Sequence, residues 1–412
     1  MKKCFYVPWL HMHQPLIWQE RNGREVLISN LEKMLTSSDQ KENWDGKLIV
    51  RAYKNPAKYV YQLSKDGYDP KVMVDFSGIL LESLHKMRKL LKTLKVENET
   101  IGDIISLYKK VLKKYPNNLE FAGTAYSHSY FPTTPKEDWE LQIIEWKKVF
   151  KKLFGQKSLK RVKGFWFPEM GIPGERNGLK DLIRILRENG YEWVFLPPEA
   201  IEGFKSLSFE KQIDMCTKPH KLVVGKEEIT AFIKVPYYFI DQQAGCDAKC
   251  VLSKCKEALR IVKDERPLIV VPASDGENGN VMMNQFFPET FEPFFKSNYK
   301  NVSSKTLSEF LEDSPDKKMD CIKIKDVGGS WVGGHQLWLE GGRRQQINKK
   351  IKRLSIMFHN VEQNVSKSKR NKILKYLLIA ETSCYTYWNS PFWFEQAEKT
   401  IEMVENLLKN ND

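Results

Sequence analysis

Short runs of apolar residues alternate with longer amphipathic segments through most of the chain. The apolar runs have the length of buried strands and lie at 3–10, 72–76, 119–125, 163–167, 193–196, 229–235 and 268–272. Apolar residues recur at helical spacing between most of these runs, at 79–94, 101–115, 136–154, 179–189 and 251–262. Residues 24–115 as a whole are expected to be mostly helical. Strands that alternate with helices are typical of parallel sheets. The pattern therefore predicts an α/β barrel with parallel strands.

A different pattern begins near residue 343. From there to the end, apolar residues keep helical spacing, with segments at 347–365, 369–383 and 393–408. A chain of 412 residues is also long for one core. We therefore predict a catalytic barrel domain over residues 1–300 and a helical domain over residues 301–412.

Two of the predicted strands end in an acidic residue. The run 163–167 is followed by Pro168, which cannot donate to a sheet ladder, and then by Glu169, near Trp166. The run 268–272 leads to Asp275. A surface position for Glu169 is the alternative for that segment taken alone. Two acidic strand ends together predict a pair of carboxylates at the mouth of the barrel.

Histidines follow two other predicted strands. His11 and His13 lie two residues apart, so they point to the same side of an extended chain. His128 follows the run 119–125. These side chains could be metal ligands, hydrogen-bond partners of a polar substrate, or buried core residues. The tandem position at a strand end favours a functional site.

Two aromatic segments lie in the last part of the chain. Trp331 stands in the glycine-rich segment 328–334, which does not match a phosphate-binding loop because no Gly-Lys-Ser/Thr follows. Trp388 stands in an aromatic cluster at 385–393. This cluster is suited both to a domain interface and to stacking against sugar rings.

The net charge of +14 raises the possibility of a nucleic-acid partner. However, the lysines are scattered along predicted helices, which indicates a solvated surface, and we expect no nucleic acid. No apolar run approaches the length of a membrane span. We expect no membrane association and a cytoplasmic location.

The seven cysteines are accordingly expected to be reduced. Cys246, Cys250 and Cys255 match no common zinc spacing and are predicted to share one face of a helix.

The order of these motifs resembles glycoside hydrolase family 57. The segments that carry the resemblance are His11-Met12-His13-Gln14-Pro15, Tyr126-Ser127-His128 followed by Pro132, Trp166-Phe167-Pro168-Glu169, Ser274-Asp275-Gly276-Glu277-Asn278 and the cluster around Trp388. The resemblance implies a (β/α)7 barrel followed by a helical domain. It also implies the activity of an α-amylase, amylopullulanase, 4-α-glucanotransferase or α-glucan branching enzyme.

The resemblance assigns roles to single residues. Glu169 is similar to the nucleophile of a retaining mechanism and Asp275 to its general acid/base, with Glu277 as the rival acid. The groups expected to contact the sugar substrate are His11, His13, His128, Trp166, Glu277, Trp331 and Trp388. The expected partner is an α-glucan or oligosaccharide, without cofactor or metal.

The chain departs from the family pattern where many members have an Asp before the last aromatic run. Here the residue is Cys384, and Glu381 is the nearest carboxylate in the sequence. Two alternatives therefore stay open. One is a metal-dependent deacetylase or α-mannosidase that uses His11, His13 and Asp275; the other is a glycan-binding protein without activity.

Overall fold

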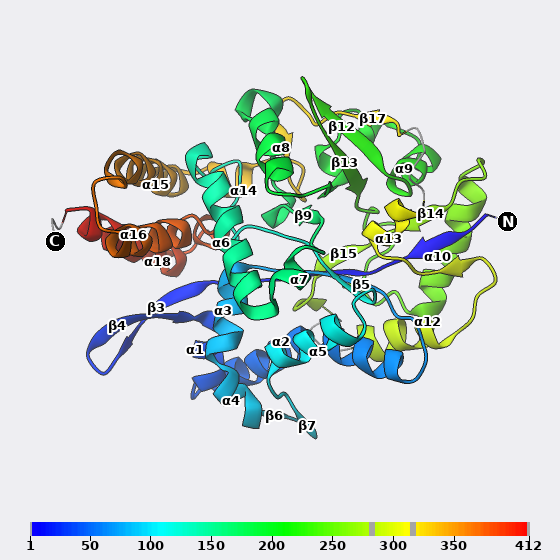
Figure 1. Ribbon diagram of the computed structural model, residues 1–412, viewed down its shortest axis with the longest axis horizontal. Coiled ribbons are helices and arrows are strands. Elements are labelled where there is room, and N and C mark those ends of the chain that lie inside the picture. The colour runs from blue at the N-terminus through cyan, green and yellow to red at the C-terminus, as the bar shows by residue number, and fades with distance from the viewer. Residues whose placement is uncertain (1, 280–284, 314–318, 410–412) are drawn as a thin grey trace.

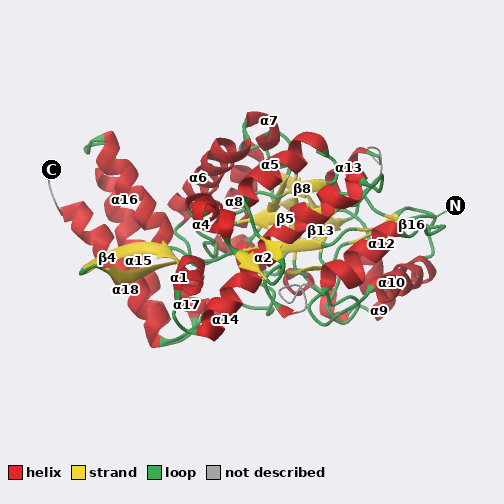
Figure 2. Ribbon diagram, turned by 90° about the horizontal axis from the view of Figure 1, so that it is seen from below, coloured by secondary structure: helices red, strands yellow, loops and turns green. Residues whose placement is uncertain are grey.

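A ring of parallel strands forms the centre of the molecule. The computed structural model describes residues 2–279, 285–313 and 319–409. The ring strands are β2 (Trp9–Met12), β5 (Val72–Phe76), β8 (Leu119–Phe121), β9 (Gly164–Trp166), β11 (Trp193–Leu196), β13 (Glu227–Ile233) and β15 (Ala273–Asp275). Helices surround this ring, as Figures 1 and 2 show.

Pairing between neighbouring strands closes the ring. The strand β2 pairs in parallel with β15 and β5, and β5 pairs with β8. A parallel bridge between Gly123 and Phe165 continues the ring to β9, which pairs with β11, and β11 pairs with β13. Val235, just after β13, donates its N–H to the carbonyl of Val271 at 3.2 Å and completes the circle. The predicted (β/α)7-type barrel is confirmed.

Proline divides two of the ring strands. The strand β1 (Cys4–Tyr6) precedes β2 across Pro8, and β14 (Leu268–Val270) precedes β15 across Pro272. The segments β1 and β14 pair with each other in parallel, as β2 and β15 do. Because proline lacks an N–H, each strand loses one backbone hydrogen bond at its proline. The same two segments of the chain pair in parallel before and after the prolines.

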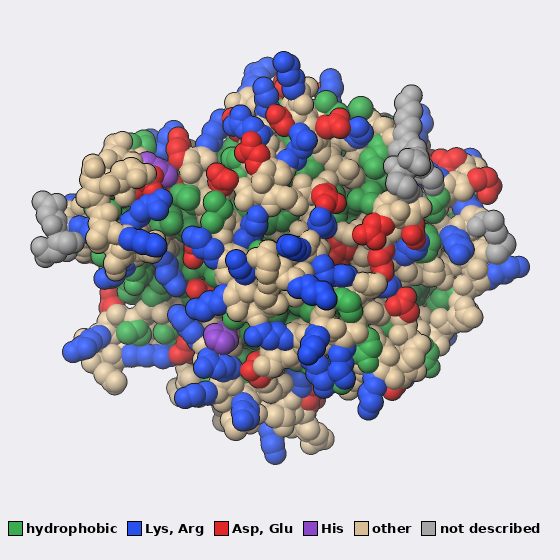
Figure 3. All heavy atoms as spheres, in the orientation of Figure 1, with side chains coloured by type: hydrophobic (Ala, Val, Ile, Leu, Met, Phe, Trp, Pro, Cys, Tyr) green, Lys and Arg blue, Asp and Glu red, His purple; other side chains and the backbone are tan. Residues whose placement is uncertain are grey.

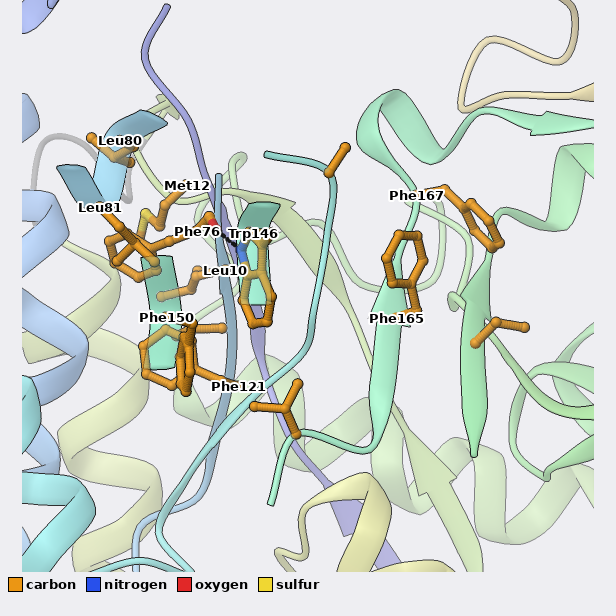
Figure 4. Close-up of a cluster of buried hydrophobic side chains, with 14 of the residues drawn as sticks. Leu10, Met12, Phe76, Leu80, Leu81, Phe121, Trp146, Phe150, Phe165 and Phe167 are labelled. Atoms are coloured by element: carbon orange, nitrogen blue, oxygen red, sulfur yellow. Dashed lines mark hydrogen bonds between the residues drawn. The ribbon is translucent and has the colours of Figure 1, made fainter. Parts of the chain in front are cut away.

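Two apolar layers stabilise the barrel. The interior is filled by large side chains such as Trp9, Trp166, Trp193 and Phe195. The outer layer lies between the strands and the helices; Figure 4 shows part of it, including Phe76, Phe121 and the ring of Trp146, whose indole N–H donates to the Phe76 carbonyl at 2.8 Å. Side chains on both faces of these strands are therefore buried, which explains their continuous apolar runs.

In the sequence, the barrel helices lie mainly between the ring strands. They are α2 (Gln40–Lys65), α3 (Gly78–Lys86), α4 (Arg88–Thr93), α5 (Ile104–Lys114), α6 (Lys136–Phe154), α7 (Gln156–Leu159), α8 (Leu179–Glu188), α9 (Phe209–Cys216), α10 (Ala248–Ile261), α12 (Glu292–Lys296) and α13 (Leu307–Glu312). Short outlying strands are β6 (Lys95–Val96), β7 (Glu99–Thr100), β10 (Ile172–Pro173), β12 (His220–Val224), β16 (Val302–Ser303), β17 (Cys321–Ile322) and β18 (Gly328–Gly329). In the helix α13, Leu307 and Phe310 pack into the barrel interior.

The last part of the chain forms a helical bundle beside the barrel. Its main helices are α15 (Gly342–Val361), α16 (Lys367–Ala380) and α18 (Pro391–Lys409), preceded or joined by α14 (Gln336–Leu339) and α17 (Cys384–Tyr387). A C-terminal helical domain is thus confirmed. The division at residue 300 stays a prediction, and residues 1, 280–284, 314–318 and 410–412 of the two predicted ranges lie outside the described residues.

Residues 24–115 are mostly helical, as predicted, but a β-hairpin at the start of this range was not predicted. The strands β3 (Leu16–Arg21) and β4 (Arg24–Ser29) pair antiparallel before the helix α1 (Asn30–Thr36). The hairpin extends to the helical bundle, where the indole N–H of Trp18 donates to Thr400 of α18 at 2.9 Å. It is stabilised by a partner distant in sequence, which a local pattern does not reveal.

The cysteine predictions are wrong for one pair. Cys246 and Cys250 form a disulfide with their Cα atoms 5.3 Å apart, within the usual bridging range. Cys246 precedes the helix α10, which begins after the N-cap Asp247, so the three cysteines do not share one helical face. The other five cysteines are free, and of these only Cys321 is exposed.

The surface shown in Figure 3 carries Lys and Arg side chains spread among acidic ones rather than gathered in one patch. This distribution fits the predicted solvated surface. Within the described ranges, no helix combines the length and the apolar character needed to cross a bilayer.

Candidate active site

Glu169 lies on a tight turn directly after β9. Its backbone has φ 56° and ψ 19°, and the next residue, Met170, also has a positive φ of 47°. Such angles are strained for residues with a Cβ. The turn is held against Tyr130, since a Cβ on Gly171 would lie 2.0 Å from that ring. The chain thus fixes the direction in which the Glu169 side chain leaves the barrel.

Two donors from the C-terminal part of the chain hold the Glu169 carboxylate. The Ser383 hydroxyl donates to Oε1 at 2.9 Å, and the indole N–H of Trp331 donates to Oε2 at 3.1 Å. Each oxygen therefore has a donor and an orientation. Burial, together with repulsion from Asp275, raises the pKa of Glu169 to about 7, while the two hydrogen bonds act in the opposite direction.

Asp275 is the last residue of β15 and lies opposite His11 in the parallel register with β2. The side-chain amide of Asn278 donates to its Oδ2 at 2.9 Å. The charge of Asp275 acts on Glu169, as the pKa of Glu169 shows, so the two carboxylates belong to one electrostatic site. A separation of about 5 to 5.5 Å between their nearest oxygens, as retaining enzymes require, stays a prediction.

Glu277 lies two residues beyond Asp275 and is partly buried. Burial, together with the charge of Asp275, raises the pKa of Glu277 well above its ordinary value. Its Oε2 atom is buried and has no hydrogen-bond partner among the residues that the structure describes. A protonated carboxyl with a free oxygen fits a contact to a sugar hydroxyl, and the roles of Glu277 as a substrate contact or as the rival acid stay predictions.

His11 is fixed by a residue that the sequence patterns did not single out. Asp75, fully buried in β5, accepts from Nδ1 of His11 at 2.6 Å and from the Trp9 indole at 2.7 Å. Burial opposes a charge on His11, but the carboxylate of Asp75 raises the pKa of His11 to about 9. The sequence feature that could have revealed Asp75 is an acidic residue inside the apolar run 72–76.

The three predicted histidines converge. The ring centroids of His11 and His13 lie 4.8 Å and 4.0 Å from that of His128. His13 shares a hydrogen bond with the Ser77 hydroxyl at 2.8 Å, and its Nε2 lies 3.4 Å from the Cys384 sulfur. Cys384 therefore faces the site, whereas Glu381 bonds to Gln142 of α6 and does not replace the missing Asp.

The predicted aromatic contacts differ in exposure. Trp166 is buried and stacks on His11 with centroids 5.2 Å apart, and its indole N–H has no partner. Trp331 and Trp388 are 42% and 56% exposed. Tyr387 contacts both rings, so these three aromatics form a continuous surface beside Glu169.

One group of side chains could in principle hold a metal ion. His13, His128 and Cys384 offer ligand atoms within 4.8 Å of one another. This set differs from the alternative set of His11, His13 and Asp275. Both ring nitrogens of His128 and the Nδ1 of His13 already have hydrogen-bond partners. The arrangement fits a hydrogen-bonded site better than a metal centre, and we assign no metal to it.

Comparison with solved structures shows the same fold in three enzymes. A 4-α-glucanotransferase from Thermococcus litoralis is 18% identical with a TM-score of 0.68, and the match covers 99% of this chain and 60% of that one. A branching enzyme from Pyrococcus horikoshii is 15% identical (TM-score 0.67; 98% and 88% covered). An α-amylase from Thermotoga maritima is 15% identical (TM-score 0.66; 99% and 93% covered).

The chain thus spans less than two thirds of the glucanotransferase but most of the other two enzymes. A search of curated proteins found no match. The sequence model of glycosyl hydrolase family 57 matches residues 7–325, well over half of the chain. The resemblance seen in the motifs is confirmed, and the chain belongs to glycosyl hydrolase family 57.

Proposed function

We propose that this protein is a retaining enzyme that cleaves or transfers α-glucans, with Glu169 as the nucleophile and Asp275 as the general acid/base. The observation that carries the proposal is the Glu169 carboxylate, oriented by two hydrogen bonds and under the influence of the Asp275 charge. Family membership makes the chain a glycoside hydrolase or transglycosylase. The α-glucan substrate follows from what the three similar structures are named to act on.

The reaction proceeds in two displacements. In the first, ionised Glu169 attacks the anomeric carbon while Asp275 gives its proton to the oxygen of the departing sugar. In the second, Asp275 takes a proton from water or from an acceptor hydroxyl, whose oxygen displaces Glu169. Water gives hydrolysis, and a sugar hydroxyl gives transfer. The configuration at the anomeric carbon is retained because it is inverted twice.

Polar atoms around the nucleophile are suited to sugar hydroxyls. The free indole N–H of Trp166 is a donor and the free oxygen of Glu277 is an acceptor or, when protonated, a donor. The exposed faces of Trp331 and Trp388 offer stacking surfaces for further sugar rings. We include a cytoplasmic location in the proposal; the five free cysteines support it and the Cys246–Cys250 disulfide counts against it.

The variant Glu169→Gln tests the nucleophile. It keeps the shape of the side chain but removes the negative charge that makes the carboxylate a nucleophile, so turnover of maltooligosaccharides should fall by about 10³-fold or more. Binding of the same ligands should change much less. The assays include a chelator throughout, because the proposed reaction uses no metal. Near-normal turnover in a folded variant would refute the assignment.

Azide distinguishes the nucleophile from a merely structural carboxylate. In Glu169→Gly a small anion can enter the vacated space and attack the anomeric carbon of an α-linked donor. The product should be the β-glycosyl azide, from one inversion, with partial recovery of donor cleavage. An α-glycosyl azide would contradict the proposed direction of attack.

A further inference from the structure

A continuous chain of side-chain hydrogen bonds connects a buried carboxylate to the nucleophile. We call it the relay chain; it consists of Asp75, His11, His128 and Ser383 and ends on Glu169. The donor–acceptor distances along it are 2.6 Å, 2.8 Å, 2.8 Å and 2.9 Å. Asp75, His11, His128 and Ser383 are all less than 9% exposed, so water does not compete for these bonds.

The direction of every hydrogen bond follows from the Glu169 end when this residue is ionised. A carboxylate only accepts, so the single hydrogen of the Ser383 hydroxyl is used there. Ser383 must then accept from His128, which places a hydrogen on Nδ1 of that ring. Burial, reinforced by the charges of its neighbours His13 and His11, holds the pKa of His128 far below its usual range, so the ring is neutral and its Nε2 accepts.

The other end of the chain then carries a positive charge. His11 donates from Nε2 to His128 and from Nδ1 to Asp75, so it holds both ring hydrogens. The raised pKa of His11, about 9, agrees with this assignment. The geometry thus pairs a buried imidazolium with Asp75 at one end of the chain and a carboxylate with Ser383 at the other.

The chain can also run in the opposite direction. A protonated Glu169 would donate to Ser383, Ser383 to Nδ1 of His128, and Nε2 of His128 to a neutral His11. No hydrogen enters or leaves the chain; one proton has moved in effect from His11 to Glu169. Two N–H groups cannot face each other between His11 and His128. While the chain is intact, the proton is therefore either on His11 or on Glu169, but not on both.

We propose that the relay chain is a proton relay that keeps Glu169 ionised for attack by holding the shared proton on His11. Asp75 and Ser383 act in it as positioning residues, since neither reacts with the sugar. This inference rests on the proposed function only in calling Glu169 the nucleophile. The hydrogen-bond directions follow from the geometry together with an ionised Glu169 and a neutral His128.

Other charged and titratable groups also face the relay chain and influence the pKa values of its members. Around Glu169 they are Asp275 on β15, Cys384 and Tyr387 on α17, and Tyr130 on the loop after β8. Around His11 they are Asp275, Glu277 and His13. Besides His11, the Trp9 indole and the charge of Asp275 act on Asp75. All of them remain in place in the variants below, so shifts between variants report the relay chain.

Nitrogen NMR of the full-length protein reads the hydrogen positions without any substrate. In ¹⁵N-histidine-labelled enzyme at about pH 8, below the pKa of about 9 for His11, His128 should be the neutral Nδ1–H tautomer and His11 should carry both hydrogens. Single His→Gln variants assign the signals. A neutral His11 at this pH, or an Nε2–H tautomer of His128, would overturn the relay even if Glu169 proves to be the nucleophile.

The pH profile of kcat/KM tests the consequence for Glu169. Ser383→Ala removes a hydrogen-bond donor to the Glu169 carboxylate, and Asp75→Asn lets His11 lose its positive charge. Both changes should raise the pKa of Glu169 and move the acid limb to higher pH by about one unit, the effect of one hydrogen bond to a charged group. Ser383→Thr keeps the hydroxyl and should keep the limb. Thr386→Val removes a hydrogen bond to the Ser383 backbone carbonyl but leaves the Ser383 hydroxyl in place, so it should also leave the limb unchanged.

An unchanged acid limb in a folded Ser383→Ala variant would refute the relay's effect on Glu169. If Asp75→Asn does not fold, Ser383→Ala and the NMR spectra still decide. If Glu169→Gln retains turnover, the proposed function fails, whereas the tautomers of His11 and His128 still show whether the relay exists.

Discussion

Glu169 brings together two features that cost stability. Its backbone lies in the left-handed region, and its carboxylate, with a side chain only 15% exposed, must ionise near Asp275. Ser383 and Trp331 offset part of this cost by donating to the charge. A residue tolerated at such expense is typical of a reacting group rather than of a structural one.

We therefore expect Glu169→Gln to be more stable than the wild type at neutral and higher pH. The folded pKa of about 7 lies above the ordinary value of 4.5, so the folded wild type loses stability as pH rises through this interval. Above pH 7 the difference should reach about 3 kcal/mol. Below pH 4.5 both states of the wild type are protonated and the difference should vanish. Urea unfolding at several pH values measures it; equal stability at pH 8 would contradict the expected cost.

The sequence predicted the acidic and histidine site residues from their position along strands. Glu169, Asp275 and the histidines lie at or beyond the ends of strands, and these ends meet at one mouth of a barrel. Asp75 and Ser383 escaped this reasoning. Asp75 is inside a strand, and its role depends on Trp9 and His11 from the neighbouring strand. Ser383 reaches Glu169 across a sequence separation of 214 residues.

At the scale of elements, local pattern predicted the buried strands and several barrel helices well. The strands at 72–76 and 193–196 and the helix at 136–154 have the bounds expected from the sequence. Their apolar residues face neighbours that are close in the barrel order. The hairpin of β3 and β4 was missed because its alternation is short and the partner of Trp18, the helix α18, lies about 380 residues later, as expected for a tertiary contact that overrides local propensity.

An ion pair between helices links the bundle to the barrel. His359 of α15 contacts the fully buried Asp138 of α6 at 2.8 Å and Glu362 at 3.0 Å. The hydrogen bond to Asp138, although opposed by burial, raises the pKa of His359 to about 9, with further support from Glu362. The contact should therefore favour the docked arrangement of these helices most strongly while His359 is protonated.

We expect His359→Gln to lower the free energy of unfolding by about 1 to 2 kcal/mol at pH 6. The folded pKa of about 9 is above the ordinary 6.5, so the contribution is complete below pH 6.5 and is lost as pH rises through 9. His85→Gln is the matched control, because the pKa of His85 is lowered in the folded state and protonation of His85 therefore does not stabilise the fold. A loss that persists unchanged at pH 10 would show that packing, not charge, explains the effect.

At the scale of the whole molecule, the barrel does not build the candidate site alone. Both donors to the Glu169 carboxylate, Ser383 and Trp331, come from beyond the barrel strands. Buried links such as Trp18 to Thr400 and Gln142 to Glu381 attach the bundle that positions them. The arrangement of the bundle against the barrel therefore controls the ionisation and direction of the nucleophile.

These links predict that the barrel and the bundle unfold together. Trp18 is 7% exposed, and its indole donates to Thr400 while its ring stacks near Tyr376. Trp18→Ala should lower the free energy of unfolding by about 3 kcal/mol, as for large buried aromatics. Far-UV circular dichroism, tryptophan fluorescence and catalytic activity should all shift to lower urea concentration as one transition, because losing the bundle removes the donors of Glu169. Trp44→Ala, at a position 41% exposed, is the matched control and should change stability by about 0.5 kcal/mol or less. A variant whose helical signal is lost well before its activity would show instead that the bundle is dispensable for the site.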